Sequence, residues 1–227
     1  MKENGFSYKT INNYKRSLKA SFYMAIEDNC VRKNPFDFQL SEVIEDDSKP
    51  KVALSEEQEA RLLGFMEQDR TYQKYYDDVL ILLKTGLRIS ELCGLTKSDI
   101  DFKNHTVRIN HQLLKDKDGF YIAEPKTKSG IRNVPMNEET EKAFKRVLKR
   151  KQKPKFKEID GYHNFLFISP NGHPMQESSY KTVLNGVVKK YNKNHEKTPL
   201  LRITPHSLRH TFCTQLAQKN MNPKNLQ

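Results

Sequence analysis

The segment TGLRISEL, residues 85–92, places Arg88 just after a glycine, at the predicted start of a helix. Backbone N–H groups and a guanidinium at a helix start both suit a phosphate group. Glu91 follows about one helical turn later, so an ordinary surface pair between Arg88 and Glu91 explains the same spacing. The segment by itself therefore leaves a phosphate site and a surface ion pair open.

A second segment, PHSLRH at residues 205–210, places His206 and Arg209 on one face of a predicted helix, near its first turn. Thr204 suits the N-cap position of this helix, and the proline after it suits the first helical position. A histidine and an arginine presented together there could clamp a phosphate. The alternative is a histidine used in capping and an arginine in solvent.

The turn PKTKSG, residues 125–130, carries Lys126 between two predicted strands. A lysine on a short turn can reach into a groove of another molecule, whereas a lone turn lysine usually stays in water. The turn by itself therefore leaves a lysine that enters a groove and a solvated lysine both open.

Several other kinds of site lack residues. The sequence has no glycine-rich phosphate loop and no acidic cluster with metal-ligand spacing, and Asp99 and Asp101 fit a loop or cap role. Cys30, Cys93 and Cys213 form neither a disulfide framework nor a zinc motif. We therefore predict no metal and no other cofactor. Positive charge aimed at a phosphate remains, as in a metal-free phosphoryl transfer.

The charge of the chain is unevenly distributed. The net charge is +12, but residues 1–50 hold 8 Lys/Arg and 8 Asp/Glu, so the whole surplus lies in residues 51–227. Residues 125–157 alone hold 12 basic residues against 3 acidic ones. A basic zone of this density suits double-stranded DNA, although a lysine-rich surface that only aids solubility explains composition equally well. Neither a membrane-spanning run nor a signal segment is seen, so we expect a cytoplasmic protein without a membrane partner.

The elements that must position these residues are mostly helical. An apolar stripe predicts a helix over residues 11–26, and the acidic stretch 41–50 is interpreted as a linker. Ser55 and Gln58 form a predicted capping box at the start of the next helix. Further helices are predicted near residues 71–84, 88–95, 137–151, 176–191 and 206–219, and Gly86 is predicted to end the first of them, since glycine allows a positive φ at a helix end.

Three short runs alternate with period two and are separated by turn signals, at residues 106–109, 120–122 and 131–135. They predict a three-stranded antiparallel meander. The predicted fold class is α+β and mainly α, a mostly helical domain with one small three-stranded antiparallel sheet.

Taken together and in this order, TGLRISEL, PKTKSG and HSLRH resemble the tyrosine recombinase, or phage integrase, family. The resemblance implies that residues 1–49 are the end of a helical core-binding domain with its linker, and residues 50–227 the catalytic domain. It implies an integrase of a phage or a conjugative element that cleaves and rejoins DNA through a 3′-phosphotyrosyl intermediate. It also implies four protomers on double-stranded DNA, and no small-molecule substrate.

The resemblance also implies roles for single residues. Arg88 and Arg209 would contact the scissile phosphate, His206 would assist proton transfer, and Lys126 would protonate the leaving 5′ hydroxyl, with Glu91 as a support near Arg88. The expected DNA contacts are Lys126, Lys128, Arg132 and His210.

The sequence departs from the family at one point: no tyrosine follows Arg209, and the last one is Tyr191. We therefore expect the nucleophile to be missing from these residues. Two alternatives stay open, a truncated DNA-binding module without catalysis and an enzyme like a type IB topoisomerase.

Overall fold

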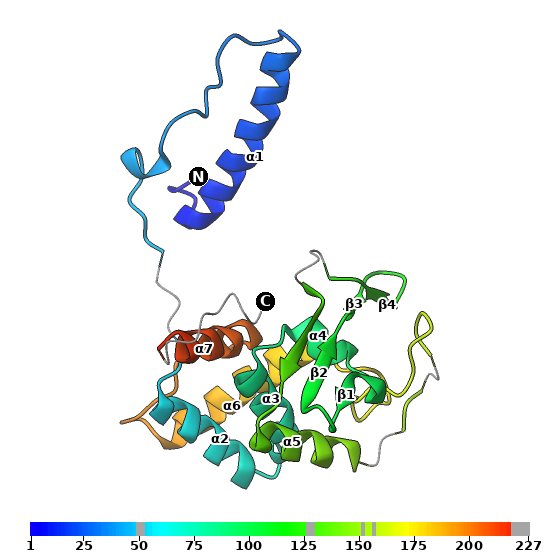
Figure 1. Ribbon diagram of the computed structural model, residues 1–227. Coiled ribbons are helices and arrows are strands. Elements are labelled where there is room, and N and C mark those ends of the chain that lie inside the picture. The colour runs from blue at the N-terminus through cyan, green and yellow to red at the C-terminus, as the bar shows by residue number, and fades with distance from the viewer. Residues whose placement is uncertain (49–52, 126–129, 151–152, 156–157, 219–227) are drawn as a thin grey trace. The chain divides into compact units, whose positions relative to one another are not determined.

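The computed structural model describes residues 1–48, 53–125, 130–150, 153–155 and 158–218. The chain forms two compact units, Met1–Lys51 and Val52–Gln227, whose elements are labelled in Figure 1. Each unit is described by itself.

The first unit is one long helix with a chain segment that returns along it. Helix α1, Tyr8–Glu27, begins at Ser7, whose hydroxyl accepts a hydrogen bond from the Thr10 N–H. The returning segment places Phe36 against Phe22, with ring centroids 5.3 Å apart. The predicted apolar stripe is therefore divided, because Ile11 is buried whereas Tyr14 and Leu18 on the same stripe stay exposed.

The predicted linker at residues 41–50 has some structure of its own. A 3-10 turn, η1, covers Leu40–Glu42. Further on, the Asp47 carboxylate accepts a hydrogen bond from the Tyr8 N–H at 3.2 Å, which ties this stretch to the start of α1. The acidic composition signalled an irregular segment, but it did not reveal this contact.

The second unit is built around helix α3, Tyr76–Thr85, whose residues 79–83 are almost completely buried. Figure 1 shows the other helices arranged around α3. They are η2 (Gln73–Tyr75), α2 (Glu56–Gln68), α4 (Ile89–Gly94), η3 (Lys97–Asp99), α5 (Glu138–Leu148), α6 (Glu177–Asn194) and α7 (Pro205–Gln218). The predicted capping box is confirmed, since Ser55 and Gln58 exchange hydrogen bonds at the start of α2.

The strands are short and antiparallel, but they do not pair as a meander. Strand β2, Thr106–Ile109, lies between β1, Ile100–Asp101, and β5, Arg132–Pro135. Strand β4, Phe120–Ala123, pairs instead with β3, Gln112–Lys115, in a separate hairpin. The predicted pairing of residues 120–122 within the three-stranded sheet is therefore wrong, because the unpredicted strand β3 takes that partner.

Asp99, a buried polar residue at the end of η3, has a structural role. The buried Asp99 carboxylate accepts hydrogen bonds from the Thr96 N–H at 2.8 Å and the Thr96 hydroxyl at 2.7 Å. The predicted cap role of Asp99 is therefore confirmed.

In the described parts of the chain, no helix has the length and apolar character needed to cross a membrane.

Candidate active site

The glycine turn between α3 and α4 brings Arg88 to the surface. Gly86 has φ of 62°, a left-handed conformation that glycine adopts without strain, and its N–H bonds to the Leu82 carbonyl at 3.1 Å. Leu87 then turns into the core, so Arg88 takes the N-cap position of α4 with its side chain 52% exposed. The helix end predicted at Gly86 is confirmed.

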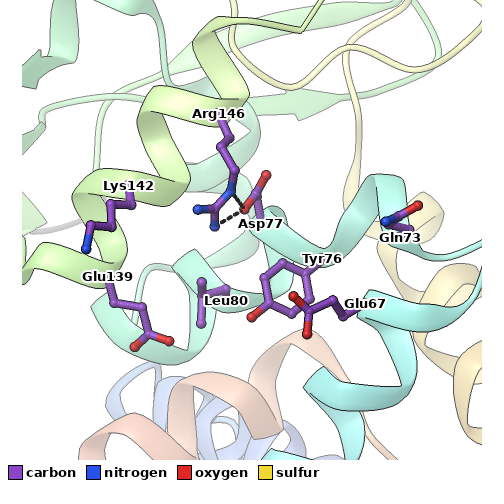
Figure 2. A pocket seen from close by; sticks show the side chains of 8 residues that line it. All are labelled: Glu67, Gln73, Tyr76, Asp77, Leu80, Glu139, Lys142 and Arg146. Carbon is purple, nitrogen blue, oxygen red and sulfur yellow. Dashed lines mark hydrogen bonds and ion pairs between the residues drawn. The ribbon is translucent and has the colours of Figure 1, made fainter.

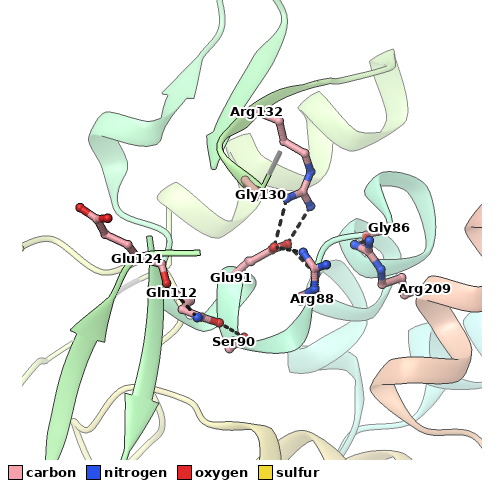
Figure 3. Close-up of polar contacts among 9 residues, drawn as sticks. All are labelled: Gly86, Arg88, Ser90, Glu91, Gln112, Glu124, Gly130, Arg132 and Arg209. Atoms are coloured by element: carbon pink, nitrogen blue, oxygen red, sulfur yellow. Dashed lines mark hydrogen bonds and ion pairs between the residues drawn. The ribbon is translucent and has the colours of Figure 1, made fainter. Parts of the chain in front are cut away.

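The Glu91 carboxylate is the centre of a group of arginines, shown in Figure 3. Its Oε1 accepts from Arg88 Nη1 at 2.8 Å and from Arg132 Nη1 at 3.1 Å. Its Oε2 accepts from the Arg88 backbone N–H at 2.8 Å and from Arg132 Nη2 at 2.8 Å. Glu91 is therefore neither a surface residue nor half of a simple i, i+3 pair: its side chain is 2% exposed and holds two arginines.

Burial by itself would raise the pKa of Glu91, since a charged carboxylate loses hydration inside a protein. The hydrogen bonds and the charge of Arg132, followed by the hydrogen bonds of Arg88, outweigh this effect and hold the pKa below its ordinary value. Glu91 is therefore ionised at neutral pH, and it neutralises one positive charge.

Helix α7 brings a third arginine to the same place. Its start is fixed by Thr204, whose hydroxyl accepts from the Ser207 N–H at 3.1 Å, so the predicted N-cap is confirmed. Arg209 on this helix donates a hydrogen bond to the Gly86 carbonyl. A Cβ atom added to Gly86 would lie 2.1 Å from Phe212 of α7. The glycine therefore provides both the turn and the space for α7 to pack.

Two further contacts hold α7 in place. The Leu54 N–H donates to the Thr211 hydroxyl at 2.9 Å, and Gln215 donates to Glu59 at 2.8 Å. Glu59 is buried in α2 and also binds Lys84 of α3 at 2.6 Å. The position of Arg209 thus depends on contacts with α2 and with the turn after α3.

The arginines leave the site with unbalanced positive charge. Burial lowers the pKa of Arg209, and the positive charge of Arg88 lowers it further. Arg209 forms no ion pair with any residue that the structure describes. Three guanidiniums therefore lie near the single negative charge of Glu91, which binds two of them, and the surplus positive charge can attract an anion beside the exposed Arg88.

The structure places most of the predicted site residues. Arg88 and Arg209 come together although they are far apart in sequence, and His206 is exposed in the first turn of α7, before Arg209. His210 is half-buried on the same helix. Lys126 and Lys128 lie outside the described residues.

Sequence reasoning missed the contact between Arg132 and Glu91. These residues are 41 positions apart, and no sequence motif contains both of them. It also missed Gln112, which accepts a hydrogen bond from Ser90 at 2.9 Å and so ties α4 to strand β3. Both contacts depend on strand placement.

A separate pocket of about 390 Å³ lies between α3 and α5 (Figure 2). Its charged residues include Asp77 and Arg146, which form a hydrogen-bonded ion pair with a 2.8 Å contact. Three carboxylates and two basic groups line this pocket, so it has no positive surplus for a phosphate. The residues described here also contain no group of His, Cys, Asp and Glu that could hold a metal ion.

Comparison with known proteins identifies relatives of this chain. Residues 53–227 match the model of the phage integrase family. The transposase from transposon Tn916 of Enterococcus faecalis is 61% identical over 229 residues, a match that covers 100% of the chain and 56% of that relative. Tyrosine recombinase XerC of Bacillus pumilus is 26% identical, with 99% of the chain and 67% of that protein covered. The chain thus spans 56% of the length of the Tn916 relative.

Solved structures agree with this result. The Tn1549 transposon integrase in complex with a circular intermediate DNA is 57% identical, with a TM-score of 0.95, covering 100% of the chain and 72% of that structure. A lambda integrase dimer bound to a core site, 14% identical with a TM-score of 0.58 over 93% of the chain and 68% of its own, shares the fold. The predicted mainly helical α+β class with a small antiparallel sheet is confirmed.

Proposed function

Because this chain belongs to the phage integrase family, as its three motifs predicted, we propose that it is part of a site-specific DNA recombinase of a mobile genetic element. The recombinase cleaves and rejoins double-stranded DNA through a 3′-phosphotyrosyl intermediate, without metal or nucleotide cofactor. One observation carries the proposal: Arg88 and Arg209 meet at a turn where three arginines lie near a single carboxylate, Glu91, which binds two of them, Arg88 and Arg132. A DNA phosphodiester supplies the missing negative charge.

The proposed chemistry is covalent catalysis at phosphorus. A tyrosine hydroxyl gives up its proton with the help of His206 and its oxygen attacks the scissile phosphate, while the bond to the 5′ oxygen breaks and Lys126 gives a proton to that oxygen. Arg88 and Arg209 hold the phosphate oxygens as charge develops on them, and His206 assists proton transfer. The bond energy stays in the phosphotyrosyl link, so rejoining needs no ATP.

Other parts of the proposal concern the whole protein. No tyrosine follows Arg209 in this sequence, so we assign the attack to a tyrosine outside these residues. Residues 1–49 are proposed as the end of a core-binding domain and residues 50–227 as the catalytic domain. Four protomers act on DNA in the cytoplasm. Lys128 and His210 are further DNA contacts, and a direct DNA contact of Arg132 stays a prediction.

The names of two relatives support DNA as the partner. The Tn916 relative is a transposase, and the Tn1549 integrase was solved with a circular intermediate DNA. Both match the whole of this chain.

The decisive experiment replaces Arg88 by alanine in the full-length protein, translated from the complete reading frame. On nicked cognate DNA, which traps the covalent adduct, we expect adduct formation to be lost while the Kd for DNA changes little. Arg61→Ala is the matched control, since Arg61 is an α2 arginine paired with Glu57. An adduct that persists in Arg88→Ala would remove Arg88 from the active site. An unaltered full-length protein that binds DNA without forming an adduct would overturn the proposal in favour of a binding module. Relaxation of supercoils without site preference would instead favour an enzyme like a type IB topoisomerase.

The role of the turn lysines is tested separately. We expect the Lys126→Ala variant not to cleave normal DNA. It should still cleave a substrate with sulfur in place of the 5′ bridging oxygen, because a thiolate leaves without a proton. Lys128→Ala should weaken binding and cleave both substrates alike. If only Lys128→Ala is rescued by sulfur, the general acid is Lys128.

A further inference from the structure

Arg132 is the first residue of strand β5, and its side chain is only 9% exposed. A buried guanidinium is costly unless it is paired and hydrogen-bonded. Its Nη1 and Nη2 donate to the two oxygens of Glu91 at 3.1 and 2.8 Å, and Nη1 also donates to the Gly130 carbonyl at 3.0 Å. The guanidinium is thus directed inward, toward protein groups.

This contact determines how Glu91 can hold Arg88. The two parallel hydrogen bonds from Arg132 fix both the position and the plane of the Glu91 carboxylate, which a single contact cannot do. On its other side, the same carboxylate receives the Arg88 side chain and the Arg88 backbone N–H, both at 2.8 Å (Figure 3). The side chain of Arg88 is half-exposed, so little else restrains its guanidinium in the described residues.

We propose that Arg132 is a positioning residue, which orients Arg88 for the scissile phosphate by locking the Glu91 carboxylate. This inference rests on the proposed function. It competes with the direct DNA contact predicted for Arg132, and two observations favour it. The side chain is nine-tenths buried, and its two terminal nitrogens are occupied by Glu91 and Gly130.

The electrostatics of the site agree with this role. Among the groups that lower the pKa of Glu91, Arg132 has the largest effect and Arg88 the next, while burial acts in the opposite direction. The third guanidinium near this carboxylate is that of Arg209. Loss of Arg132 should therefore raise the pKa of Glu91, so that Glu91 becomes protonated, and releases Arg88, at a higher pH than in the unaltered protein.

The first test is Arg132→Lys, which keeps the charge and loses the two-pronged contact. In the full-length protein, we expect the single-turnover cleavage rate to fall by about 100-fold, because a small displacement of a phosphate ligand is enough for such a loss. The Kd for DNA should be unchanged. Arg108→Lys is the control, since Arg108 lies on the neighbouring strand β2 with a 58% exposed side chain. A weaker Kd with an unchanged cleavage rate for bound DNA would show a direct DNA contact and overturn the inference.

The second test is a double-mutant cycle with Glu91→Gln. If Arg132 acts through Glu91, Arg132→Lys has no further effect on cleavage once Glu91 is replaced. Two losses that simply multiply would overturn the inference. Arg132→Met adds the pH readout: its cleavage rate should begin to fall at a higher pH than that of the unaltered protein. If Arg132→Met does not fold, the cycle of Arg132→Lys with Glu91→Gln still tests the inference.

A third measurement does not depend on cleavage. In the 227-residue chain without DNA, the Nε–H NMR signal of Arg88 should report an ordered side chain, which becomes mobile in Arg132→Lys. If the full-length protein proves inactive on DNA but this difference is found, the proposed function fails and the positioning role stands. Equal mobility of Arg88 in both proteins would overturn the positioning role.

Discussion

Single residues at this site show how a cluster of arginines is kept stable before any anion binds. The Glu91 carboxylate accepts four hydrogen bonds, two from Arg88 and two from Arg132, and it neutralises one of the three nearby positive charges. The remaining repulsion is visible at Arg209, whose pKa is lowered by burial and then by Arg88. A bound phosphate would relieve this repulsion, and the relief would contribute to the free energy of anion binding.

We predict that Glu91→Gln lowers the free energy of unfolding by about 1–3 kcal/mol at neutral pH, because it leaves buried guanidinium donors without a charged acceptor. The folded pKa of Glu91 is lowered, so its stabilising effect is complete above the unfolded pKa of about 4.3 and is lost as the pH falls through the folded value. Urea unfolding of both proteins between neutral and acidic pH measures the difference. A gap that widens on acidification would contradict this account.

At the scale of elements, the site is a meeting point of the turn after α3, the start of α4, strand β5 and helix α7. Gly86 serves two of them, because its positive φ ends α3 and its missing side chain lets Phe212 of α7 approach. Arg209 then reaches the Gly86 carbonyl. The distance between Arg88 and Arg209 is therefore determined by how closely α7 packs on this turn.

We predict that Gly86→Ala destabilises the protein by more than about 1 kcal/mol, because alanine is strained at this φ and its Cβ would overlap Phe212. The cleavage rate should fall as well, since α7 must move away. Gly64→Ala is the control: Gly64 lies in α2 with nothing within 4 Å of an added Cβ, and alanine there should raise stability by about 0.5–1 kcal/mol. Thermal unfolding of the two variants tests this, and equal midpoints would refute the packing argument.

For the whole molecule, the net charge of +12 overstates the positive charge that is free to attract a polyanion. Arg146 and Arg150, both in the basic stretch 125–157, bind Asp77 and Asp78 of α3. They attach α5 to the central helix and have their charge neutralised there. Part of the basic composition that suggested a DNA partner is therefore structural.

We predict that the DNA affinity of the 227-residue chain falls steeply as salt rises from ~50 to ~200 mM, because each phosphate contact releases counterions. Lys128→Gln should reduce the slope of log K against log salt by about 1. Arg150→Gln should leave the slope unchanged, since Arg150 is paired with Asp77 and Asp78. Fluorescence anisotropy over a salt series measures both, and an affinity independent of salt would exclude the basic surface as the DNA face.

The sequence by itself determined the local features. The capping box at Ser55, the left-handed turn at Gly86 and the N-cap at Thr204 were all predicted correctly, because each depends on residues within one or two turns of chain. The order of the three motifs was also enough to identify the family.

Only the tertiary structure decided which distant elements meet. Alternation in a strand shows which face is buried, but not which strand lies beside it, so the pairing of β2 with β5 and of β3 with β4 could not be predicted. The same reason hid the Arg132–Glu91 contact, which depends on where β5 lies against α4. The sequence identified the residues of the site, and long-range packing determined which of them hold one another.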